Sequence, residues 1–123
     1  MNYTQTLEFL FTSMPSFQQV GSDAYKPGLE RITEFCRHLG NPQRNYFTIH
    51  VAGTNGKGSV AHMLASILSQ AGYRTGLYTS PHLVDFRERI SVDNEFIPKQ
   101  KVVNFVDKHQ AKMQELDLSF FEM

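Results

Sequence analysis

A short glycine-rich stretch with one lysine is the part of this sequence best suited to chemistry. Residues 52–59 read AGTNGKGS, and Lys57 is the only cation among them. Glycines let a backbone curl around an anion, backbone N–H groups bind phosphate oxygens, and a lysine adds positive charge. The candidate nucleotide-binding residues are Gly53, Thr54, Asn55, Gly56, Lys57, Gly58 and Ser59.

The spelling of this stretch departs from the common phosphate-binding loop, G-x-x-x-x-G-K-[ST]. Val51 stands where the first glycine is expected, Gly58 follows the lysine, and the hydroxyl comes one residue later, at Ser59. Two interpretations follow. The stretch is either a phosphate-binding loop with altered chemistry or a tight turn that carries a solvated lysine. The order of apolar strand, glycines, lysine, hydroxyl and helix favours the phosphate-binding loop.

The elements that must position this loop alternate between strands and helices. Strand, loop, helix and strand in succession form a βαβ unit with a right-handed crossover. We therefore expect an α/β fold that contains a phosphate-binding loop and a mostly parallel sheet flanked by helices. Apolar spacing predicts helices over residues 3–14, 28–39, 60–71 and 98–116, and β-branched and aromatic runs predict strands over residues 46–52, 74–79, 89–92 and 118–122.

Composition narrows the class of protein. The 123 residues suffice for one domain. The 12 basic residues balance 12 acidic ones, so the net charge gives no general attraction to nucleic acid or to an anionic membrane. Cys36 is the single cysteine, which fits a reducing compartment. The sequence has no signal-peptide pattern and no apolar run near the roughly 20 residues that span a bilayer. We expect a cytoplasmic protein.

Three further stretches carry a family resemblance. They are GLYTSPHL at residues 76–83, RERI at residues 87–90 and KPGLERI at residues 26–32. Together with AGTNGKGS they resemble the folylpolyglutamate synthase and dihydrofolate synthase family, which belongs to the Mur-ligase-like superfamily of ATP-dependent amide ligases. The resemblance covers most of the chain from residue 25 to residue 122. The altered loop spelling is that family's own form.

The resemblance implies a reaction and its cofactors, ATP and Mg²⁺. ATP phosphorylates the carboxylate of dihydropteroate or of a folate, and the amine of L-glutamate then attacks the acyl phosphate. The resemblance implies a catalytic role for Lys57 at the phosphates and a role for Ser80 as a magnesium ligand. From the residues alone, Ser80 is more simply a turn residue before Pro81, and Ser59 is an alternative contact for metal or phosphate.

The resemblance also implies substrate-binding residues near both ends of the chain. Those before GLER would line a pteridine site, and those near the C-terminus would contact the pterin. Aromatic rings can stack on a pterin and a carboxylate can accept its N–H groups. Phe120 and Phe121 are equally well explained as strand core, whereas Glu122 is not. The implied substrate-binding residues are Tyr25, Lys26, Pro27, Ser119, Phe120, Phe121 and Glu122.

Other polar residues have structural interpretations. Cys36 lies on an apolar helical stripe and is predicted to be inert core. We assign His82 no role in proton transfer. The three charges of RERI either position the neighbouring loop or are solvated, and the sequence does not choose between these. His50 and His62 are predicted to be structural.

The apolar pattern at the C-terminal end predicts a longer parent protein, because domains rarely end inside a core strand. The resemblance implies that residues 1–123 are the N-terminal part of an ATP-binding domain, without the rest of that domain or a C-terminal glutamate-binding domain. We expect an inactive fragment that self-associates and a monomeric parent enzyme. The alternatives are a Mur-type ligase, against which GLER and TSPHL argue, and a non-catalytic nucleotide-binding module.

Overall fold

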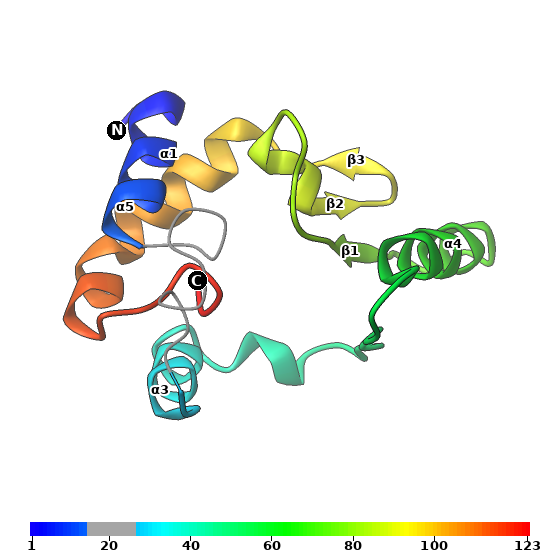
Figure 1. Ribbon diagram of the computed structural model, residues 1–123, viewed down its shortest axis with the longest axis horizontal. Coiled ribbons are helices and arrows are strands. Elements are labelled where there is room, and N and C mark those ends of the chain that lie inside the picture. The colour runs from blue at the N-terminus through cyan, green and yellow to red at the C-terminus, as the bar shows by residue number, and fades with distance from the viewer. Residues whose placement is uncertain (15–26) are drawn as a thin grey trace. The chain divides into compact units, whose positions relative to one another are not determined.

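The computed structural model describes residues 1–14 and 27–123. The predicted substrate-binding residues Tyr25 and Lys26 lie outside the described residues. The chain divides into two compact units (Figure 1). The first unit comprises Met1–Phe47 and Val102–Met123, and the second comprises Thr48–Lys101.

The first unit is helical, as the apolar spacing predicted. Its helices are α1, Tyr3–Ser13, and α3, Glu30–His38, with most of α5, Lys99–Glu115, and a short 3₁₀ turn, η2, Pro42–Arg44. A reciprocal capping box begins α1, because Asn2 and Gln5 each accept the other's backbone N–H at 2.9 Å. Gly40 and Asn41 follow α3 with positive φ angles, which explains why the helix ends there.

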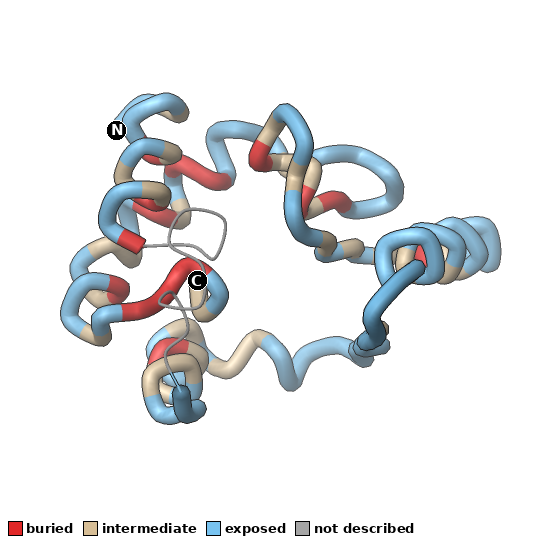
Figure 2. The backbone as a smooth tube through the Cα atoms, viewed as in Figure 1, coloured by how far each residue is buried: buried red, intermediate tan, exposed pale blue. Residues whose placement is uncertain are grey.

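The core of the first unit lies between these helices and the C-terminal segment. Leu10 of α1, Phe35 of α3 and Met113 of α5 are at most 1% exposed. Burying each such side chain contributes about 1.5–3 kcal/mol relative to leaving it in water. Phe11 stacks on Phe120 with ring centroids 5.4 Å apart, which joins α1 to the C-terminal segment. Figure 2 shows the buried parts of α1, α5 and the C-terminal segment in red.

The predicted strand over residues 118–122 is wrong, since this segment forms turns. The backbone N–H of Leu118 donates to the Met113 carbonyl at 3.1 Å, and Asp117 has a positive φ of 51°. This geometry is a helix C-cap, so it satisfies carbonyls at the end of α5 and reverses the chain. The apolar residues Leu118 and Phe120 are therefore buried in a turn rather than in a strand.

The second unit contains α4, Lys57–Gln70, and a three-stranded sheet. The strands are β1, Gly76–Tyr78, β2, Ile90–Val92, and β3, Glu95–Phe96, in the order β1-β2-β3 and all antiparallel. Tyr78 pairs with Ile90, and Val92 pairs with Glu95. A 3₁₀ turn, η3, Phe86–Arg89, leads into β2. The predictions of α4, β1 and β2 are confirmed, with β1 shorter than expected.

The predicted strand over residues 46–52 and its parallel pairing are not observed. No residue of this segment is in a strand, and Phe47 and Ile49 are exposed. A strand requires a neighbour that receives its backbone hydrogen bonds, and β1 pairs with β2 instead. The α/β content is therefore confirmed, but the sheet of the described residues is antiparallel. No helix in this described part of the chain is long and apolar enough to cross a membrane.

Candidate functional site

The glycine-rich loop leads into α4, as the sequence predicted, but the helix begins at Lys57 rather than at residue 60 and includes Gly58 and Ser59. Gly56 is the N-cap of α4, with a φ of 79°, and no side chain caps the helix. The first turn of a helix has N–H groups without intrahelical acceptors, and the helix dipole makes this end positive. Residues 53–59 are exposed, so these groups are open to a ligand. The loop therefore has the geometry of an anion-binding site.

Lys57 is held at the loop rather than extended into solvent. Its Nζ atom donates to the Gly53 carbonyl at 2.6 Å and to the Thr54 carbonyl at 3.4 Å. The positive ammonium group of Lys57 and the positive N-terminal end of α4 thus both lie at the glycine-rich loop. An anion with several oxygens, such as a polyphosphate, suits that combination.

Ser80 lies directly after the β1–β2 ladder. The neighbouring Thr79 N–H donates to the Arg89 carbonyl at 3.0 Å, which continues the ladder beyond Tyr78. The hydroxyl-bearing residues Ser59 and Ser80 are both exposed. Among the described residues, no group of three or more histidine, cysteine, aspartate or glutamate side chains is placed to hold a metal ion.

Glu88 organises the loop that follows Ser80. Its carboxylate accepts the backbone N–H groups of Leu83 and Val84 at 2.9 Å and that of Asp85 at 2.5 Å. The N–H groups of Asp85, Leu83 and Val84 hold the pKa of Glu88 below its ordinary value of 4.5. The side chain therefore acts as a brace for residues 83–85 rather than as a solvated charge.

The two arginines beside Glu88 also bind within this loop. Arg89 is 5% exposed, and its Nε donates to His82 Nδ1 at 2.7 Å. Burial, and then the Arg89 cation, lower the pKa of His82. Arg87 donates from Nη2 to Asp85 Oδ2 at 2.8 Å. Of the two interpretations of the RERI charges, the structure supports loop positioning.

Three of the predicted substrate-binding residues share one network in the first unit. Glu122 accepts the N–H and the hydroxyl of Ser119, both at 2.9 Å, and pairs with Arg31 at 3.1 Å. A second nitrogen of Arg31 donates to the Pro27 carbonyl at 3.3 Å. Phe120 is core, whereas Phe121 is 58% exposed. Arg31 was not among the predicted site residues, and no local pattern links it to Glu122, 91 residues away.

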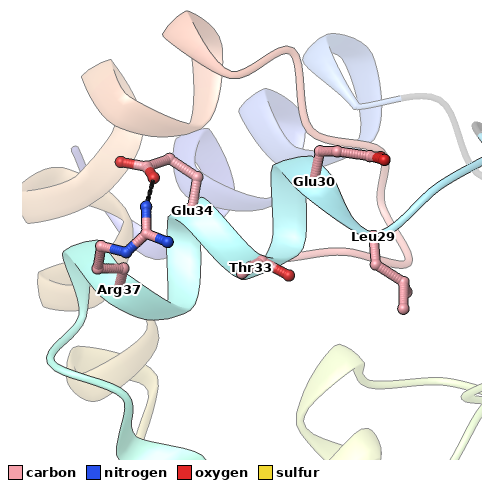
Figure 3. A pocket seen from close by; sticks show the side chains of 5 residues that line it. All are labelled: Leu29, Glu30, Thr33, Glu34 and Arg37. Atoms are coloured by element: carbon pink, nitrogen blue, oxygen red, sulfur yellow. Dashed lines mark hydrogen bonds and ion pairs between the residues drawn. The ribbon is translucent and has the colours of Figure 1, made fainter.

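A hollow on the described surface is lined by none of these residues. It has a volume of about 400 Å³ and lies along one side of α3 (Figure 3). Glu34 and Arg37, which both line it, form an exposed ion pair. A hollow along a single helix encloses little of a ligand, whereas binding sites bury most of theirs. Its lining residues are Leu29, Glu30, Thr33, Glu34 and Arg37.

The fold and the loop define a class of protein, an α/β protein with a glycine-rich loop at the start of a helix. The chain belongs to the folylpolyglutamate synthase/dihydrofolate synthase family. Folylpolyglutamate synthase of Lacticaseibacillus casei is 41% identical over 116 residues, which are 94% of this chain and 26% of that protein. No family model matches the chain.

Solved structures agree with this assignment. The folylpolyglutamate synthase of Thermotoga maritima has a TM-score of 0.81 and 44% identity, over 98% of this chain and 27% of that one. An FPGS complex with AMPPCP and folate has a TM-score of 0.82 and 38% identity, over 99% and 30% of the two chains. The chain thus spans less than a third of the length of the relatives it matches.

The first prediction separates two glycines of the loop. Gly56→Ala should destabilise the second unit by about 1–2 kcal/mol, because the left-handed conformation strains a residue with a Cβ atom. Gly58→Ala should be neutral or stabilising by up to about 1 kcal/mol, since a Cβ atom there meets nothing within 4 Å and alanine favours a helix. Urea unfolding measures both. Equal destabilisation by the two substitutions would contradict the placement of Gly56 as a left-handed N-cap and of Gly58 within the helix.

The second prediction concerns Glu88. Glu88→Gln should lower the hydrogen-exchange protection factors of the Leu83, Val84 and Asp85 amides, because a neutral amide is a weaker acceptor. Since the folded pKa is depressed, the brace is fully present above pH 4.5 and is lost as pH falls through the folded pKa. Acidification should therefore lower protection in the wild type but not in the variant. Glu95→Gln on β3 is the control, and unchanged protection in Glu88→Gln would refute the brace.

Proposed function

We propose that this chain is part of an ATP-dependent ligase that joins L-glutamate to dihydropteroate, to folylpolyglutamates or to both. The observation that carries the proposal is the glycine-rich loop at the start of α4, with Lys57 held against it. The family supports the proposal, and so does the similar FPGS complex with AMPPCP and folate. A Mur-type ligase and a non-catalytic module gain no support from the named relatives.

The proposed reaction has two steps. The acceptor carboxylate attacks the γ-phosphorus of ATP, which forms an acyl phosphate and releases ADP. The amine of L-glutamate then attacks the acyl carbon, so that an amide forms and phosphate leaves with the bonding electron pair. Such phosphoryl transfer depends on positioning and charge neutralisation more than on covalent chemistry by the protein. The N–H groups that open α4 and the Lys57 ammonium would supply both.

The acceptor would bind in the first unit. Glu122 supplies a carboxylate, which Ser119 holds through its hydroxyl, and a pterin ring carries N–H groups that a carboxylate accepts. Phe121 is exposed and offers a ring face for stacking, whereas Phe120 stacks on Phe11. Tyr25, Lys26 and Pro27 complete the proposed contacts.

The described residues do not build a protein-held magnesium site by themselves. Mg²⁺ prefers six oxygen ligands and retains several waters, and protein sites usually add carboxylates and substrate phosphates. The second unit offers the neutral hydroxyls of Ser80 and Ser59 without a carboxylate cluster. We therefore propose that Ser80 would supply one oxygen to Mg²⁺ and that the phosphates of ATP would supply others.

The exposed apolar surface of the second unit supports a longer enzyme. Val60, Met63 and Ile67 form one stripe of α4, yet each is at least 46% exposed. Helices with such a stripe normally bury it. We propose that further strands of the longer protein cover α4 and pair with residues 46–52, which would extend the sheet. Residues 1–123 would then be the first part of an ATP-binding domain and inactive alone.

Substitution of Lys57 tests the proposed function directly. Lys57→Ala in the longer enzyme should lower the rate of glutamate ligation by about 10² or more with either dihydropteroate or tetrahydrofolate, because charge stabilisation at the phosphates is lost. Lys101→Ala removes an exposed lysine outside the loop and should leave the rate unchanged. Near-normal ligation by Lys57→Ala would refute the assignment of the loop.

Ser80 is tested by a magnesium titration at saturating ATP. Ser80→Ala should raise the Mg²⁺ concentration for half-maximal ligation by roughly 2- to 10-fold, which corresponds to the loss of one neutral contact. Ser59→Ala should not. The reverse result would give the metal contact to Ser59, and two unchanged titrations would leave Ser80 as a turn residue.

A further inference from the structure

Arg31 joins two segments that are far apart in the sequence. It lies in the first turns of α3, and its Nε atom donates to both carboxylate oxygens of Glu122, at 3.1 and 3.2 Å. A second nitrogen of the same guanidinium donates to the Pro27 carbonyl at 3.3 Å. The planar guanidinium of Arg31 therefore sets the distance between Pro27 and the turn that follows α5.

The two oxygens of the Glu122 carboxylate are used unequally. Oε2 accepts from the Ser119 N–H, the Ser119 hydroxyl and Arg31. Within the described part of the chain, Oε1 accepts from Arg31 alone. A carboxylate oxygen has two lone pairs, so Oε2 is saturated while Oε1 retains the capacity to accept from a ligand. The network thus fixes the carboxylate and leaves Oε1 as the oxygen with capacity for a further donor.

This ion pair is less exposed than the other arginine pair of α3. The Glu122 side chain is 11% exposed and that of Arg31 is 27% exposed, whereas Glu34 and Arg37 are 39% and 66% exposed. Partial burial strengthens the attraction and reduces screening by salt. Desolvation acts to raise the pKa of Glu122, but its bonds from Ser119 and Arg31 outweigh this and hold the pKa below its ordinary value.

We propose that Arg31 is a positioning residue for the acceptor site, which orients Glu122 so that Oε1 accepts an N–H group of a pterin-type ring. This inference rests on the proposed function. Arg31 acts through Glu122 and Pro27 and does not itself contact the reacting atoms. A preorganised carboxylate binds without first losing conformational freedom, so the network raises acceptor affinity.

The expected kinetic effect is confined to the acceptor. Arg31→Gln in the longer enzyme should raise the KM for the pterin-bearing acceptor roughly tenfold or more, because it removes a charged hydrogen-bond donor. The ring is remote from the carboxylate that reacts, so kcat and the KM for ATP should change little. Arg31→Lys keeps the charge but offers one nitrogen for two partners, so its KM should fall between those of wild type and Arg31→Gln.

A matched control and a second readout separate this inference from the proposed function. Arg37→Gln removes the exposed arginine pair of the same helix and should leave every kinetic constant unchanged. In the chain itself, Arg31→Gln should lower the hydrogen-exchange protection of the Ser119 amide, which bonds to Glu122, and Arg37→Gln should not. This measurement requires no ligase activity.

These experiments test the positioning role of Arg31 separately from the proposed function. An unchanged acceptor KM in an active Arg31→Gln enzyme would overturn the positioning role, as would a fully wild-type KM in Arg31→Lys. If Arg31→Gln fails to fold, Ser119→Ala provides the test, because it removes one donor to Oε2 and should also raise the acceptor KM. A wild-type enzyme that ligates glutamate to no pterin-bearing acceptor would refute the proposed function, and loss of Ser119 protection would still establish the Arg31 network.

Discussion

Hydrogen bonds from backbone N–H groups to two carboxylates shape two irregular segments, the loop that follows Ser80 and the C-terminal turn that carries Ser119 and Glu122. Glu88 accepts three such groups from residues 83–85, and Glu122 accepts that of Ser119. Bonds to an ionised acceptor are roughly twice as strong as those between neutral groups. Because neither segment has a strand beside it to receive its N–H groups, these carboxylates replace the acceptors that a sheet would supply.

The glycine-rich loop follows the opposite principle. No side chain caps α4, so the N–H groups of its first turn remain available to solvent or to an anion. Lys57 bonds to carbonyls of the same loop and therefore stays beside those groups. A side-chain acceptor at this position would compete with a phosphate. In the two carboxylate-held segments, a side chain accepts backbone N–H groups. At the start of α4 no side chain does so, and this is the site suited to phosphate.

Arg31 and Arg89 show how a cation completes each carboxylate-centred segment. Arg31 binds Glu122 directly, whereas Arg89 binds His82 within the loop that Glu88 holds. Both are partly or fully buried, so removing either would take a donor from an acceptor in a place that water reaches poorly. In both segments, the geometry presented to a ligand depends on residues that would not contact it.

Local patterns determined the helices, the loop and the family. Apolar spacing predicted α1, α3, α4 and α5, and the order of glycines and lysine placed the loop at the start of α4, because helices and caps depend on residues within a few positions. Asp93 and Asn94 make the β2–β3 turn with positive φ angles, and this pair of turn-favouring residues is a sequence signal that the strand predictions missed.

Only the tertiary structure decided which apolar segments are strands and which charges meet. Residues 46–52 and 118–122 have strand-like composition, but a strand exists only where a neighbour receives its hydrogen bonds, and composition does not reveal that neighbour. The pairing of Arg31 with Glu122 spans 91 residues, and the packing of α1, α3 and α5 with the C-terminal turn brings them together. Sequence patterns report short-range preferences, whereas these contacts arise from the long-range packing of the folded chain.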